Sequence, residues 1–125
     1  MADDGNEFYG VYQIPDNPHP WVKDNVLPLL DFGLEARDAN KEAFMQRLAV
    51  WLWDYRGATV IADWPADIEH MCNLLSFAGM RQGFAVPIEL TFKLIKRANE
   101  YESLIEHNAL SDARALRDYC NDWKI

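Results

Sequence analysis

The sequence lacks an apolar run of the length that a membrane-spanning helix needs, about 20 residues. Its first residues, Met1-Ala-Asp-Asp-Gly, contain neither the basic segment nor the apolar segment of a signal peptide. Cysteine is also scarce, because Cys72 and Cys120 are the only two in the chain and both lie in patterns typical of helices. Such a pair indicates buried thiols of a reducing compartment, so we expect a cytoplasmic protein without a disulfide framework.

Basic residues are few as well. The chain has 12 Lys and Arg against 20 Asp and Glu, and its formal net charge is −8. A general nucleic-acid binder normally carries the opposite sign, although bound metal ions restore positive charge locally in acidic nucleases. An acidic chain is also suited to a basic partner protein. The charge therefore favours a protein partner and makes nucleic-acid binding a weaker expectation.

What is present is a chain of 125 residues, half of them apolar, which is enough for one domain spanning 1–125. Aromatic and β-branched residues after a turn at Asp4-Gly5-Asn6 predict a strand at 7–14. A short apolar run predicts a strand at 58–62 that is buried on both faces, and alternation predicts a third strand at 88–95. Helices are predicted at 38–57, 65–79 and 110–123, with one or two helical turns at 21–30, a loop at 81–86 and an irregular or weakly helical segment at 96–106. The order indicates an α/β fold of about three strands with flanking helices.

The helix predicted at 38–57 has the clearest pattern. Asp38 is the expected N-cap, apolar residues recur at helical spacing, and Gly57 stands where a helix commonly stops. Trp51 and Trp53 are two residues apart and cannot both face the core, so we expect Trp53 to be exposed.

Carboxylates and a histidine occur where helices are predicted to begin. Asp63 ends the strand at 58–62, Asp67 follows Pro65 in the next helix, and His107 precedes Asp112 at the start of the last helix. Carboxylates so placed, with a histidine nearby, are what two-metal phosphodiester chemistry needs. The structural alternative is that the three aspartates stabilise helix starts and that His107 lies in a solvated loop.

Four segments together resemble the bacterial and phage 3′–5′ exoribonucleases of the DEDDh superfamily, which have an RNase H-like fold. They are Gly5-Asn-Glu-Phe-Tyr, Trp21-Val-Lys-Asp-Asn-Val-Leu-Pro, Val60-Ile-Ala-Asp-Trp-Pro-Ala-Asp67 and His107-Asn-Ala-Leu-Ser-Asp112-Ala-Arg-Ala-Leu. The resemblance runs over nearly the whole chain and keeps the family's order. Its most specific part is the His-x-x-x-x-Asp element that precedes a helix.

The resemblance implies a set of site residues. His107 matches the family's general base, and Asp112 and Asp67 match metal ligands for Mg²⁺ or Mn²⁺, with Asp63 as the alternative to Asp67. The family's first motif, Asp-x-Glu on its first strand, has no counterpart here, and the strands that carry it would lie before Met1. The expected fold is therefore a truncated RNase H-like fold whose metal site is incomplete, because the missing carboxylates would bridge both ions.

Two functions follow as hypotheses. In the first, an inactive exonuclease-like protein acts by binding a protein partner, for example as a phage-type inhibitor of a nucleic-acid-binding complex, or by forming a homodimer. The exposed sheet edge left by the missing strands would make that contact. In the second, a further chain completes the site and the protein is a metal-dependent 3′–5′ exonuclease on RNA or single-stranded DNA.

Overall fold

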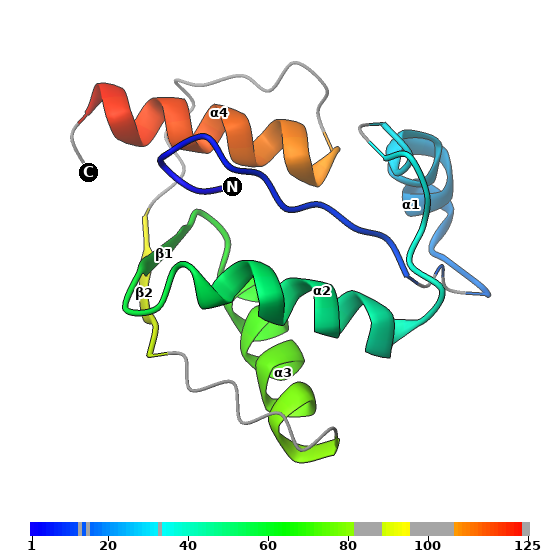
Figure 1. The fold of residues 1–125 in the computed structure, drawn as a ribbon. Helices are drawn as coiled ribbons and strands as arrows, with labels where there is room; N and C mark the ends of the chain where they lie inside the picture. The colour runs from blue at the N-terminus through cyan, green and yellow to red at the C-terminus, as the bar shows by residue number, and fades with distance from the viewer. Residues whose placement is uncertain (13, 15, 33, 82–88, 96–106, 124–125) are drawn as a thin grey trace. The chain divides into compact units, whose positions relative to one another are not determined.

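The computed structural model describes residues 1–12, 14, 16–32, 34–81, 89–95 and 107–123 (Figure 1). These residues form a mixed α/β structure with four α-helices and a parallel sheet of two strands, which confirms the predicted class. The chain divides into two compact units: the first unit comprises residues 1–40 and 99–125, and the second unit comprises residues 41–98. None of the helices in the described part of the chain is long and apolar enough to cross a membrane.

The second unit contains the sheet. Strand β1 (Thr59–Ala62) pairs in parallel with β2 (Thr91–Leu94), and helix α3 (Pro65–Arg81) lies between them in the chain and packs on β1. This helical connection is the usual one between parallel strands. Helix α2 (Lys41–Trp53) packs on α3. Its buried residues are Met45, Leu48 and Leu52, whose spacing places them on one helical face.

The boundaries of α2 differ from the predicted range of 38–57 at both ends. The helix begins at Lys41, so the prediction of Asp38 as its N-cap is wrong; the Asp38 backbone N–H instead donates to the carbonyl oxygen of Val11 at 2.8 Å. At the other end the helix stops at Trp53, before the predicted stop at Gly57; Gly57 ends the turn that follows, with a φ of 77°, a left-handed conformation that glycine adopts without steric cost. Trp53 is 49% exposed, as predicted.

Both strands predicted in this unit are confirmed in shorter form. The expectation that the strand at 58–62 is buried on both faces is wrong, because Ala62 is buried while Thr59 is exposed and the two residues between them are half-buried. A strand that has a single neighbour and one covering helix keeps part of its surface in solvent. Helix α3 begins at Pro65 as predicted and continues to Arg81, whereas the rest of the loop predicted at 81–86 lies outside the described residues.

The predicted strand at 7–14 is wrong for its described residues, which have no regular secondary structure. Aromatic and β-branched residues favour a strand only where a neighbouring strand takes up the backbone hydrogen bonds. In the first unit this segment makes a side-chain hydrogen bond instead: the Tyr9 hydroxyl donates to the Leu30 carbonyl oxygen. The predicted turn before it is confirmed, because Gly5 has a φ of 94° and the Asn6 N–H donates to Asp4 Oδ1 at 2.9 Å.

The helices of the first unit follow the predicted positions. The stretch at 21–30 forms α1 (Pro20–Asn25) and a 3₁₀ turn, η1 (Leu27–Leu29). The last helix, α4 (Ala109–Asp122), matches the predicted range closely. The segment at 96–106, predicted to be irregular or weakly helical, lies outside the described residues.

Candidate functional site

His107 and Asp112 both belong to the start of α4, but the residue that builds this helix start is Asn108. Its side-chain Oδ1 accepts a hydrogen bond from the Ser111 N–H at 3.0 Å, and its backbone carbonyl accepts from the Asp112 N–H at 2.9 Å. Asn108 is therefore the N-cap, and Asp112 lies in the first turn, where a negative charge favours the helix dipole.

The other end of the Asn108 amide connects α4 to the N-terminal part of the first unit. Its Nδ2 donates to the Leu29 carbonyl at 2.9 Å, to the Phe32 carbonyl at 3.2 Å and to the Tyr9 hydroxyl at 3.3 Å. The residue is 2% exposed. Burial raises the pKa of Tyr9, and the hydrogen bond from Asn108 acts in the opposite direction. A buried amide with partners on both ends organises the packing around it.

His107 is an exposed residue with an unusual backbone. Its φ is 66°, in the left-handed region, and its ring meets Trp21 edge-on with a centroid distance of 5.0 Å. The exposure agrees with the structural alternative, in which His107 is a solvated residue before the helix. Its role as a general base stays a prediction.

Asp63 and Asp67 belong to the second unit. Asp63 follows β1 and is half-buried, and Asp67 is exposed in the first turn of α3, where its N–H donates to the Trp64 carbonyl at 3.2 Å. The positions at a strand end and a helix start are those predicted from the sequence. Asp67 is also placed to stabilise the start of α3 through the helix dipole.

The predicted metal ligands are thus divided between the two units, with Asp63 and Asp67 in one and Asp112 in the other. Within either unit, the described residues include no group of three or more His, Cys, Asp or Glu side chains that could hold a metal ion. A two-metal site needs several oxygen ligands for each ion. Neither unit alone fits Mg²⁺ or Mn²⁺ by its described residues, and the assignment of these carboxylates as ligands stays a prediction.

An ion pair joins the N-terminal segment to α4 within the first unit. Arg114 Nε and Nη2 donate to the two carboxylate oxygens of Glu7, each at 2.7 Å. This hydrogen bonding is the main reason that the pKa of Glu7 is lower than its ordinary value of 4.5. Arg117 pairs with Asp118 at 2.7 Å. Both arginines are therefore engaged with carboxylates of the same unit.

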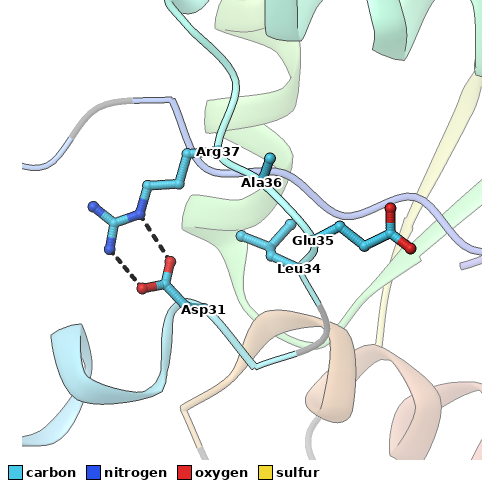
Figure 2. A pocket seen from close by; sticks show the side chains of 5 residues that line it. All are labelled: Asp31, Leu34, Glu35, Ala36 and Arg37. Carbon is cyan, nitrogen blue, oxygen red and sulfur yellow. Dashed lines mark hydrogen bonds and ion pairs between the residues drawn. The ribbon is translucent and has the colours of Figure 1, made fainter.

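The hollow that Figure 2 shows lies in the connector between η1 and α2. It has a volume of about 240 Å³ and is lined by Asp31, Leu34, Glu35, Ala36 and Arg37. Arg37 Nε and Nη2 donate to the two carboxylate oxygens of Asp31 at 2.8 and 2.9 Å. The positive charge of Arg37 is therefore balanced by the Asp31 carboxylate. Four of the five lining residues are exposed, which makes the hollow a shallow surface feature.

The sheet of the second unit leaves an outer edge on β2. The Thr91 and Ile95 N–H groups donate to the Ala58 and Ala62 carbonyls at 3.1 and 2.9 Å, and the Glu89 carbonyl accepts from the Gly57 N–H. Residues 89, 91 and 95 therefore direct their backbone groups toward β1. Because these groups alternate along a strand, those of Leu90, Phe92 and Leu94 point to the opposite side.

In the part of the chain that the structure describes, no second strand pairs with this edge of β2. Leu94 is 52% exposed, and Thr91 and Lys93 are exposed as well. Unpaired backbone groups and an exposed apolar side chain are the features that attract another strand. We call the outward backbone groups of Leu90, Phe92 and Leu94 the β2 edge.

The charge of the chain is unevenly distributed. The first unit contains 14 acidic and 5 basic residues, for a net −9, whereas the second unit contains 6 acidic and 7 basic residues, for a net +1. Almost all of the repulsion between like-charged molecules therefore comes from the first unit. The second unit, which carries the β2 edge, is close to neutral.

Two aromatic contacts also lie on the second unit, one at the exposed Trp53 and one between the half-buried Trp51 and Tyr55. The Arg56 guanidinium stacks over the Trp53 ring at 4.0 Å, and Trp51 meets Tyr55 with a centroid distance of 4.6 Å. A cation over an indole ring is a stabilising contact in its own right. The Arg56 guanidinium therefore covers one face of the Trp53 ring within the same unit.

The sequence indicated His107 and Asp112 but not Asn108 between them. An asparagine before a helical pattern is a common N-cap, so the signal for its backbone role was present. Its long-range partners Leu29 and Phe32 leave no mark in the local pattern. The comparisons with protein-family models, with curated proteins and with solved structures found no match to this chain.

Proposed function

We propose that this protein acts by binding another polypeptide strand along the β2 edge, and that it is not a nuclease on its own. The observation that carries the proposal is the outward row of backbone groups at Leu90, Phe92 and Leu94, beside the exposed side chain of Leu94. Addition of a strand to such an edge is a common mode of protein recognition, in which main-chain hydrogen bonds supply the contact.

Two further points support binding over catalysis. Within these 125 residues, the resemblance to 3′–5′ exoribonucleases includes no counterpart of the strand-borne Asp-x-Glu motif whose carboxylates bridge two metal ions in that family. The helix start that carries His107 and Asp112 also has a structural explanation, since Asn108 uses it to join α4 to Leu29 and Phe32. A small α/β unit with an open sheet edge is suited to this kind of binding.

The test is affinity capture followed by binding measurements with the purified partner, using a matched pair of variants. Leu94→Pro removes the outward N–H of Leu94, while Leu94→Ser keeps it and removes the apolar side chain. Proline is tolerated where an edge N–H faces away from the neighbouring strand, so the pairing with β1 should survive. We expect Leu94→Pro to weaken binding about tenfold or more and Leu94→Ser to weaken it less.

Three results would contradict the proposal. One is a wild-type chain that is monomeric and captures no partner. Another is binding that Leu94→Pro leaves unchanged. The third is progressive 3′ trimming of a labelled single-stranded RNA in the presence of Mn²⁺, abolished by His107→Ala, which would favour the nuclease hypothesis.

A further inference from the structure

The residues beside the β2 edge carry opposite charges in a symmetric pattern. Glu89 and Lys93 are both exposed and lie two residues before and two residues after Thr91. Residues at a spacing of two share one face of a strand, so Glu89, Thr91 and Lys93 lie on the same face. A two-fold axis through Thr91 therefore exchanges the position of the acid with that of the base.

An antiparallel neighbour related by this axis would complement the strand. Glu89 would lie opposite Lys93 of the second copy, and Lys93 opposite Glu89 of the second copy. Leu90 and Phe92 have their backbone groups on the outward side, and they would exchange N–H···O=C bonds with Phe92 and Leu90 of the second copy. Thr91 would face its own counterpart, a favourable cross-strand pair.

Another antiparallel register at the same edge is less favourable. An axis through Lys93 would place two lysines directly opposite each other, and like charges in that position destabilise the pair. A parallel arrangement of two copies along this edge would be heterologous and would not close, whereas the antiparallel arrangement forms a closed two-fold dimer. The charge pattern thus favours the register centred on Thr91 over the register centred on Lys93.

The distribution of charge also permits a second copy at this place. The second unit, which carries the β2 edge, has a net charge of +1, so this unit adds little like-charge repulsion of its own. We propose that the strand bound by the β2 edge is β2 of a second copy, antiparallel and centred on Thr91. This inference rests on the proposed function and names its partner.

The experiment uses reciprocal charge reversals in the full chain, with mass measured by light scattering over a range of concentrations. Glu89→Lys places lysine opposite lysine in its own homodimer, and Lys93→Glu places glutamate opposite glutamate. When the two variants are mixed, a heterodimer with one copy of each variant joins opposite charges at both cross-strand pairs. In that heterodimer, the lysine introduced by Glu89→Lys would face the glutamate introduced by Lys93→Glu at one pair, while Glu89 and Lys93 keep their native pairing at the second.

We expect each variant alone to weaken the dimer about tenfold or more, and the mixture to form a heterodimer close to wild-type strength. Glu69→Lys on α3 is the matched control, because it reverses an exposed acid of the same unit away from the β2 edge; it should leave the dimer unchanged. Circular dichroism of each variant checks that the fold is retained. The inference is overturned if the wild-type chain stays monomeric, if the reversals act no more strongly than the control, or if the mixture is no stronger than the single variants.

These results separate the two proposals. If the second copy fails these tests while a different purified protein binds in a manner sensitive to Leu94→Pro, the proposed function stands and its partner is not a second copy. If neither assembly depends on the β2 edge, both proposals fail.

Discussion

The side-chain Nδ2 of Asn108 donates to the carbonyl oxygen of Leu29 at 2.9 Å, across 79 residues of sequence. Together with the cap that Asn108 Oδ1 makes to the Ser111 N–H, this bond ties the start of α4 to the turn η1 within the first unit. The stability of this unit should therefore depend strongly on one amide.

We expect Asn108→Ala to lower the free energy of unfolding by about 2–3 kcal/mol, since it removes the helix cap and leaves partly buried carbonyl groups without their donor. Asn108→Ser keeps an acceptor for the cap and loses the long-range donor, so its effect should be intermediate. Urea unfolding monitored by circular dichroism measures both. An Asn108→Ala variant as stable as the wild type would show that the amide does not organise the unit.

The Glu7–Arg114 ion pair predicts a dependence of stability on pH. The pKa of Glu7 is lowered in the folded chain, so the pair contributes stability above pH 4.5, and the contribution disappears as the pH falls through the lower folded pKa. The difference in Tm between the wild type and Glu7→Gln should be constant above pH 4.5 and shrink below it.

Thermal melts at a series of pH values test this prediction. Arg114→Gln should lose the same acid-sensitive component, and the double variant should lose no more than either single variant, because both residues act through one pair. A Glu7→Gln difference that persists unchanged at the lowest pH would mean that the carboxylate charge is not responsible.

Gly57 gives a prediction about the backbone. Its φ is 77°, and nothing lies within 4 Å of the position where a Cβ would be added, so the cost of a side chain is conformational and not steric. We expect Gly57→Ala to destabilise the chain by about 1 kcal/mol and Gly57→Asn by less, since asparagine adopts the left-handed region more readily. Equal stability of Gly57→Ala and the wild type in urea unfolding would contradict the assigned conformation.

The sequence correctly predicted those helices and turns that depend on the pattern of neighbouring residues alone. Helix α2 follows from apolar residues at helical spacing, Pro65 begins α3, and Gly57 lies in the turn after α2, the last two through their own backbone preferences. The segment at 7–14 was predicted incorrectly because its composition favours a strand, but a strand also requires a neighbour that local sequence does not reveal. In the described residues Val11 and Tyr9 instead use their polar groups to contact Asp38 and Leu30.

The candidate site was predictable to the same limited extent. The positions of Asp63, Asp67 and Asp112 near a strand end and helix starts were predicted, because caps and first turns favour aspartate. The partners of Asn108 are distant in sequence and depend on how the first unit packs. The direction of the backbone groups on β2 depends on the register with β1, which becomes known only when Thr59 is placed opposite Thr91.

His107 separates the binding hypothesis from the nuclease hypothesis. His107→Ala removes the edge-on contact with Trp21, so the fluorescence of Trp21 should change. We expect the mass in solution to stay the same, since the β2 edge belongs to the other unit. Loss of a measurable RNA-trimming activity on this substitution would contradict the account.

The most direct measurement is the mass of the wild-type chain in solution by light scattering, with a labelled single-stranded RNA and Mn²⁺ assay on the same sample. The account predicts an inactive dimer of twice the 14.5 kDa chain mass, which Leu94→Pro converts to monomer. A monomer that trims the RNA progressively from its 3′ end would contradict it.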